Sequence, residues 1–169
     1  MWFLRGITFK ENCPPAPSST TSKASSPQTS PTADFKINPI MKFFIDTANL
    51  SQIREARDLG ILDGVTTNPS LMARENIRGH AAILAHYRQI CEMVDGDVSA
   101  EVLATDLDGM LAQAAELTSV HKNIVVKIPC TAEGIKAIKS LSAKNIATNC
   151  TLVFTAGQAV LAAKAGARY

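Results

Sequence analysis

The chain has 169 residues, of which 46% are hydrophobic and 19% charged, and its formal net charge is +2. This composition is typical of a soluble domain and argues against a membrane protein, since no apolar run reaches membrane-spanning length. The lysines and arginines are scattered along the chain, so we expect neither a nucleic-acid-binding nor a membrane-binding surface.

The first 40 residues differ in composition from the rest. The segment from Pro14 to Thr32 is dominated by serine, threonine and proline and has no aliphatic side chain larger than alanine. It cannot bury enough apolar surface to order itself, so we predict a disordered leader over 1–40 and a folded domain over 41–169. A weak similarity of the leader to organellar transit peptides leaves an organelle as the alternative to the cytoplasm. In another interpretation, Met41 is the true start.

From Met41 onward, short β-like runs alternate with helical patterns. In chain order we predict a strand at 41–46, a helix at 49–60 ended by Gly60, a very short strand within 64–70, a helix at 81–94 and a strand at 97–105. Then follow a helix capped by Thr105, a strand at 123–129, a helix capped by Thr131, a strand at 146–154, a helix at 155–166 and the beginning of a sixth strand at 167–169. This alternation predicts an α/β fold with parallel strands and helical crossovers.

Polar residues lie at or near the carboxyl ends of the predicted strands. They are Asp46, Thr66, Asn68, Glu101, Lys127, Asn149 and Thr151. In a parallel α/β barrel these ends meet on one face, which carries the active site. Each residue also has a structural interpretation: Asp46 or Thr66 could cap the next helix or turn, Asn68 could serve the turn before its proline, and the last two could satisfy backbone groups.

Lys127 is unusual because it ends an apolar run, in the stretch "NIVVKIPCT". Burying an ammonium without a partner is costly, so such a lysine tends to lose its proton, and a neutral amine is a nucleophile towards carbonyls. The alternative is a lysine whose stem packs on the core while its charge reaches solvent. The four cysteines show neither metal-ligand spacing nor a compact disulfide framework, which favours a reducing compartment such as the cytoplasm and predicts no metal.

The motifs "FFIDTANL", "GVTTNPSLM", "SAEVLATD", "IVVKIPCTAEGIKAI" and "NCTLVFTAGQA" resemble the transaldolase family, which includes the small fructose-6-phosphate aldolases. The resemblance spans 41–169 in the family's order. It implies an (α/β)8 TIM barrel, of which about five of the eight βα units are present here. It also implies ring-shaped homo-oligomers for the full-length form.

The resemblance implies a role for each polar residue. Lys127 would form a Schiff base with a ketose phosphate, and Asp46 would take the proton of the C4 hydroxyl. Glu101 with Thr151 would position a proton-relaying water, while Thr66, Asn68 and Asn149 would orient the substrate and the lysine. The iminium is the electron sink, so no metal or other cofactor is expected.

A glutamate at position 101 is associated with transaldolases and a glutamine with fructose-6-phosphate aldolases. The resemblance therefore implies transfer of a dihydroxyacetone unit between sugar phosphates in the pentose phosphate pathway, with the aldolase as alternative. The chain stops where the sixth strand should begin, without the serine and arginine that the resemblance associates with substrate phosphate. A non-catalytic fragment is the alternative of another class.

Overall fold

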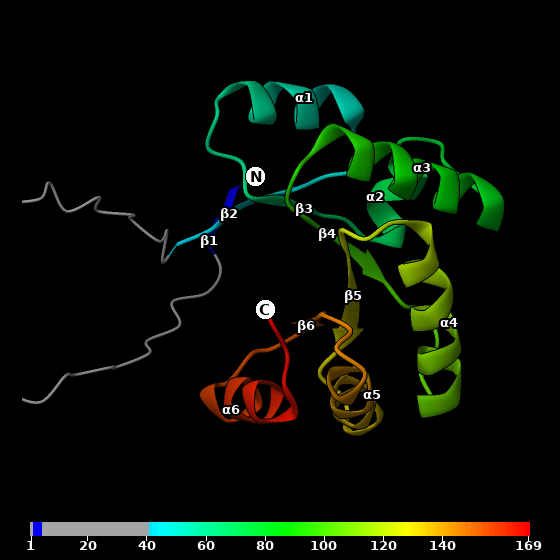
Figure 1. Cartoon of the computed structure of the whole chain (residues 1–169), viewed down its shortest axis with the longest axis vertical. Helices are drawn as coiled ribbons and strands as arrows, with labels where there is room; N and C mark the ends of the chain where they lie inside the picture. The colour runs from blue at the N-terminus through cyan, green and yellow to red at the C-terminus, as the bar shows by residue number, and fades with distance from the viewer. Residues whose placement is uncertain (1, 5–40) are drawn as a thin grey trace, which may run out of the picture. The chain divides into compact units, whose positions relative to one another are not determined.

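A six-stranded sheet organises the part of the chain that the computed structural model describes, residues 2–4 and 41–169 (Figure 1). Its strands, in both spatial and chain order, are β1 (Trp2–Leu4), β2 (Phe43–Asp46), β3 (Gly64–Thr66), β4 (Asp97–Glu101), β5 (Ile124–Pro129) and β6 (Thr148–Thr151). β1 pairs antiparallel with β2, and the other five strands are parallel.

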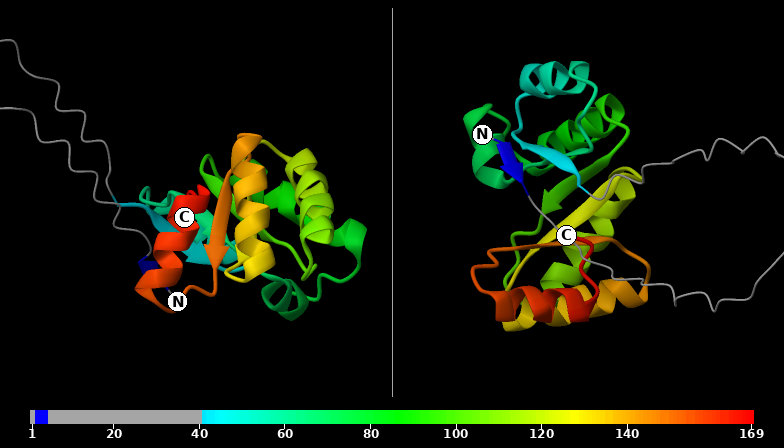
Figure 2. Two further views of the ribbon diagram at one scale, coloured as in Figure 1. Left: turned by 90° about the horizontal axis from the view of Figure 1, so that it is seen from below. Right: turned by 90° about the vertical axis from the view of Figure 1, so that its left-hand side faces the viewer.

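The helices are α1 (Leu50–Asp58), α2 (Pro69–Arg74), α3 (His80–Met93), α4 (Leu107–Val120), α5 (Ala132–Ala143) and α6 (Ala156–Ala165). The helices α1 to α5 lie in the crossovers between the parallel strands, and α6 follows the last strand. The parallel strands curve so that these helices follow the outer face of the sheet, as the two further views confirm (Figure 2). This is the arrangement of an (α/β)8 barrel, and the predicted incomplete barrel with five βα units is confirmed.

Apolar side chains between the strands and the helices hold the layers together. Residues that face the helices include Val65, Val98 and Ile128, while Ile53 and Ile90 meet them from α1 and α3. All five are fully buried. Complete burial of one such side chain stabilises the fold by about 1.5–3 kcal/mol, so these contacts are the main source of the cohesion between the layers.

Local sequence signals explain most of the helix ends. Gly60 follows the last turn of α1 and has a φ of +73°. This is the left-handed conformation predicted for the residue that ends this helix. Thr131 caps α5 as predicted, because its side chain accepts a hydrogen bond from the backbone N–H of Gly134.

Several local details were predicted wrongly or missed. α4 is capped by Asp106 rather than Thr105, and the Asp106 carboxylate accepts a hydrogen bond from the Gly109 N–H at 2.8 Å. The helix α2 was not predicted, although Asn68 as N-cap followed by Pro69 in the first turn is a recognised start signal. The predicted strands at 97–105 and 146–154 are also too long, since pairing stops at Glu101 and Thr151.

The predicted leader lies outside the described residues apart from Trp2–Leu4, which form β1 beside β2. The division at residue 40 therefore stays a prediction. At the other end of the sheet, residues 167–169 begin to extend it beyond β6. Arg168 N–H donates to the Thr148 carbonyl at 2.9 Å, and Cys150 N–H donates to the Tyr169 carbonyl at 2.9 Å. No helix in the described part of the chain is long and apolar enough to span a membrane.

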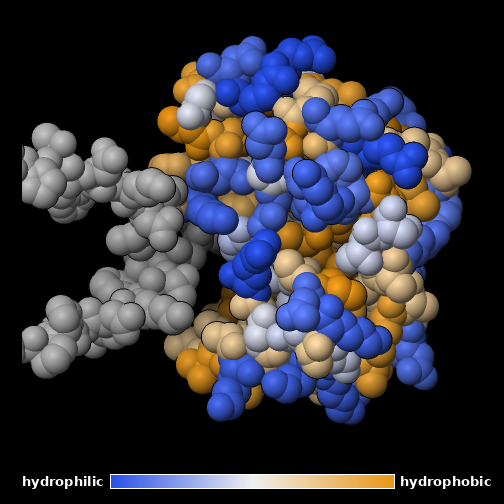
Figure 3. All heavy atoms as spheres, in the orientation of Figure 1, coloured by the Kyte–Doolittle hydropathy of each residue, from blue (hydrophilic) through white to orange (hydrophobic). Residues whose placement is uncertain are grey.

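The exposed side of α6 is mostly apolar, and Lys164 is the charged residue of this helix. Figure 3 shows orange and tan side chains gathered at the lower left, where α6 lies in Figure 1. Val160 and Leu161 on this helix are 67% and 56% exposed, and Phe154 just before it is 80% exposed.

Candidate active site

The strand register brings most of the predicted site residues to one end of the barrel. Asp46 of β2 lies beside Thr66 of β3, and Glu101 of β4 lies beside Lys127 of β5, which in turn lies beside Asn149 of β6. Four of these five residues line one cavity. Residues far apart in the sequence thus share one face, as the barrel prediction required.

Lys127 lies inside the barrel with two oxygen atoms near its amine. Its Nζ is 3.2 Å from Glu101 Oε2 and donates to the Thr67 carbonyl at 3.5 Å. The side chain of Lys127 is 11% exposed and that of Glu101 20%. The expectation of an amine left without a partner by its apolar strand is therefore wrong, because the register places a carboxylate beside it.

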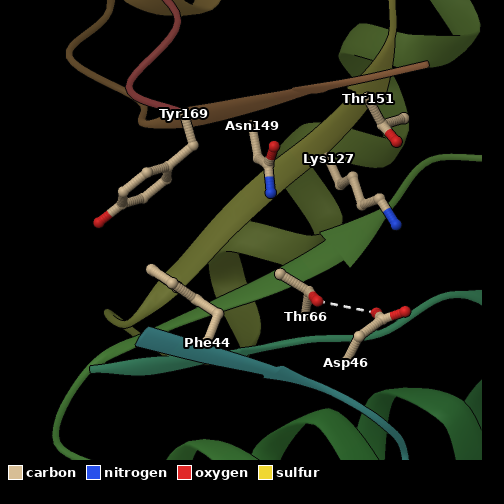
Figure 4. A pocket seen from close by; sticks show the side chains of 7 residues that line it. All are labelled: Phe44, Asp46, Thr66, Lys127, Asn149, Thr151 and Tyr169. Carbon is tan, nitrogen blue, oxygen red and sulfur yellow. Dashed lines mark hydrogen bonds between the residues drawn. The ribbon is translucent and has the colours of Figure 1, made fainter. Parts of the chain in front are cut away.

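Asp46 has a fixed orientation. The Thr66 hydroxyl donates a hydrogen bond to Asp46 Oδ1 at 2.7 Å (Figure 4). This hydrogen bond restricts the rotation of the Asp46 carboxylate. Thr66 was predicted to orient substrate; in the structure its hydroxyl is directed at Asp46.

A cavity of about 180 Å³ connects these groups. It is lined by Phe44, Asp46, Thr66, Lys127, Asn149, Thr151 and Tyr169. In Figure 4 the side chains of Lys127, Asn149 and Asp46 come from separate strands and border the same space. The cavity therefore combines an amine, a carboxylate, an amide and hydroxyl groups.

Asn68 takes no part in this cavity lining. It is the N-cap of α2, and its Oδ1 accepts a hydrogen bond from the Leu71 N–H at 3.0 Å. The structural interpretation considered for Asn68 was a role in the turn before Pro69, whereas the structure shows it capping the helix that Pro69 begins. Its role towards substrate stays a prediction. Glu101 is also absent from the lining, but its carboxylate contacts Lys127, which does line the cavity.

Sequence reasoning missed the two aromatic residues of the cavity, Phe44 and Tyr169. Their rings meet edge to face with centroids 5.1 Å apart. The Tyr169 hydroxyl donates to Asp97 at 2.8 Å and accepts from Lys42 at 3.0 Å, at the amino ends of the strands. Burial raises the pKa of Tyr169. The alternation of side chains along a strand could have revealed Phe44, because it lies two residues before Asp46 in β2 and therefore shares its inward face.

Tyr87 of α3 supports the strand that carries Glu101. Its hydroxyl is the acceptor for the Glu101 backbone N–H at 3.4 Å, and the residue is 2% exposed. Burial raises the pKa of Tyr87 from 10.0 to about 12. The unfolded chain thus releases this proton near pH 10 and the folded chain near pH 12, so raising the pH between these values favours unfolding.

We expect Tyr87→Phe to flatten this alkaline loss of stability. At pH 8 the variant should be less stable than the parent by about 1 kcal/mol, because the Glu101 N–H loses its acceptor. Between pH 9 and pH 12 the parent should lose on the order of 2 kcal/mol more than the variant. Urea unfolding followed by circular dichroism at each pH measures the difference, and a gap that stays constant with pH would contradict the prediction.

Comparison with known proteins identifies the family. A sequence model described as "Transaldolase/Fructose-6-phosphate aldolase" matches residues 43–169. The chain belongs to this family. It is 70% identical over 129 residues to a protein of Porphyromonas gingivalis named "Probable transaldolase", and 68% and 67% identical to proteins of the same name from Parabacteroides distasonis and Bacteroides fragilis. Each match covers 76% of this chain and 59% of the relative's length.

Family membership confirms the resemblance that the motifs carried. The matched range begins two residues after Met41 and contains all seven predicted site residues. The description of the family names two kinds of enzyme, transaldolases and fructose-6-phosphate aldolases.

Proposed function

We propose that the whole protein, of which this chain carries five βα units, is a Schiff-base transaldolase that moves a dihydroxyacetone unit between sugar phosphates. The observation that carries the proposal is the 3.2 Å contact between Lys127 Nζ and Glu101 Oε2 inside the barrel. The carboxylate gives Lys127 an adjacent base, to which the ammonium can pass a proton before the amine attacks a carbonyl. The names of the relatives agree with this assignment.

Formation of the Schiff base begins with a proton transfer from the Lys127 ammonium to Glu101. The neutral amine attacks the ketone carbon of the donor sugar, and the carbonyl oxygen takes up a proton to give a carbinolamine. Loss of one water leaves an iminium on Lys127. The ammonium and the ketone thus yield the iminium and water, and Glu101 with Thr151 serves as the proton relay through a held water.

Cleavage of the carbon–carbon bond depends on Asp46. Its carboxylate takes the proton of the C4 hydroxyl, the electron pair of that O–H bond forms the C4=O double bond, and the C3–C4 bond breaks. The electron pair of that bond moves into the iminium and gives a neutral enamine on Lys127. An aldose phosphate leaves. Thr66 holds Asp46 in orientation for this step through its 2.7 Å hydrogen bond.

The enamine then adds to an acceptor aldehyde by the reverse of these steps. The proposed donors are sedoheptulose 7-phosphate and fructose 6-phosphate, and the proposed acceptors are glyceraldehyde 3-phosphate and erythrose 4-phosphate. These exchanges belong to the non-oxidative pentose phosphate pathway. If the enamine were instead protonated and released, the protein would be a fructose-6-phosphate aldolase, which the family description also includes.

Glu101→Gln tests which of the two reactions the site performs. An amide can orient a water but cannot exchange a proton with it, so carbinolamine dehydration and imine hydrolysis lose their relay. We expect transfer of dihydroxyacetone from fructose 6-phosphate to erythrose 4-phosphate to fall about tenfold relative to direct cleavage of fructose 6-phosphate. Both rates are measured with the same preparation, so that partial unfolding cancels in the ratio.

Glu133→Gln is the matched control, because Glu133 lies on the surface in an ion pair with Lys136. It should leave both rates unchanged. If Glu101→Gln leaves the ratio of the transfer rate to the cleavage rate unchanged, the protein is instead assigned as the aldolase. Loss of both rates without any Schiff base at Lys127 would contradict the proposed mechanism.

A further inference from the structure

Ser99 is a buried polar residue in the middle of β4 to which no role has yet been given. It is fully buried, with 0% exposure, and shares the inward face of the strand with Asp97 and Glu101 because side chains alternate along a strand. The neighbouring Val98 and Ala100 are part of the apolar core. A serine hydroxyl at such a position requires a hydrogen-bond partner.

The partner of Ser99 is Asn149, which lies two strands away on β6. Asn149 Nδ2 donates to Ser99 Oγ at 3.0 Å, and Asn149 is 4% exposed. The two strands are separated by β5, so the bond spans one strand. Side chains of alternate strands also meet in this way in the interior layers of a barrel. Ser99 thus contacts a cavity residue without lining the cavity itself.

This contact decides which end of the Asn149 amide is available. An asparagine side chain has two N–H donors and one acceptor oxygen. Its Nδ2 is held by Ser99, whereas Asn149 Oδ1 is buried and has no hydrogen-bond partner among residues 2–4 and 41–169. Asn149 also lines the cavity beside Lys127 (Figure 4). A buried acceptor without a partner in a cavity wall is suited to a donor on the ligand.

We propose that Ser99 is a positioning residue that keeps the carbonyl oxygen of Asn149 available as an acceptor for a hydroxyl group of the three-carbon unit bound to Lys127. This inference rests on the proposed function for the identity of that unit. It extends the function by a residue outside the cavity lining that acts only through Asn149. Without Ser99 the amide rotates freely and presents its NH2 group for part of the time.

The test is a double-mutant cycle on the rate of Schiff-base formation with fructose 6-phosphate, trapped by borohydride. Ser99→Ala should slow trapping about tenfold, the effect of one lost buried hydrogen bond, and Ser99→Thr, which keeps the hydroxyl, should restore much of the rate. In the Asn149→Ala background, Ser99→Ala should have no further effect. Equal effects of Ser99→Ala in both backgrounds would overturn the proposal, because a merely structural role does not depend on Asn149.

Thr148→Val is the matched control. Thr148 is equally buried on the strand of Asn149, and its hydroxyl has no partner within the described residues. Trapping should be unchanged in this variant. If the parent gives no trapping at all, the proposed function fails, and NMR of the Asn149 side-chain amide then tests Ser99 separately. Its protons should exchange more slowly with solvent in the parent and in Thr148→Val than in Ser99→Ala, and equal exchange would overturn the role of Ser99.

Discussion

Replacement of Lys127 by methionine is expected to abolish Schiff-base formation and turnover. Methionine keeps most of the side-chain stem but has no amine, so no carbinolamine can form at this position. In the whole protein we expect kcat to fall by at least about 10⁴-fold, since covalent catalysis is lost together with its electron sink. Borohydride reduction in the presence of fructose 6-phosphate, followed by peptide mass spectrometry, should show an adduct on Lys127 in the parent and none in the variant.

Lys122→Met is the control for this experiment, because Lys122 is an exposed lysine that precedes the same strand. It should retain both the adduct on Lys127 and the turnover. Lys127→Met leaves Glu101 without its counter-ion, so thermal unfolding should be measured alongside to show that the variant is folded at the assay temperature. An adduct of undiminished yield in folded Lys127→Met would place the Schiff base on another lysine.

The sequence predicts the strands themselves better than it predicts which residues of adjacent strands lie side by side. Alternating strand and helix patterns predicted the parallel sheet, and polar residues at strand ends predicted that Asp46, Glu101 and Lys127 share one face. Those predictions needed only the period of the pattern and its order along the chain. The pairing of Glu101 with Lys127 required the register between two strands, which sequence spacing alone does not give.

Helix starts show a second limit of prediction from sequence. Thr105 and Asp106 are both good N-cap residues, and only the backbone geometry decides which side chain reaches the free N–H groups of the first turn. The hydrogen bond between Asn149 and Ser99 joins residues 50 positions apart, on strands that are not neighbours. Such a contact depends on the curvature of the barrel, and no local pattern encodes it.

Asp46→Asn should separate Schiff-base formation from cleavage of the carbon–carbon bond. Asparagine has nearly the shape of aspartate, and its Oδ1 can still accept the hydrogen bond from the Thr66 hydroxyl. An amide cannot accept the proton of the C4 hydroxyl, so the iminium should form and then stop before cleavage. We expect release of glyceraldehyde 3-phosphate from fructose 6-phosphate to slow about 10²–10⁴-fold, the range for loss of a general base.

The measurement compares two quantities in one variant: the yield of borohydride-trapped adduct on Lys127 and the rate of aldehyde release. Asp58→Asn is the control, because Asp58 is an exposed carboxylate paired with Arg57, and its removal should change neither quantity. If Asp46→Asn lost the adduct and the cleavage together, Asp46 would be needed to form the Schiff base rather than to break the bond. If it kept both, the general base would have to be another group, and the short distance between Asp46 and Thr66 would then reflect a role in holding β2 and β3 together.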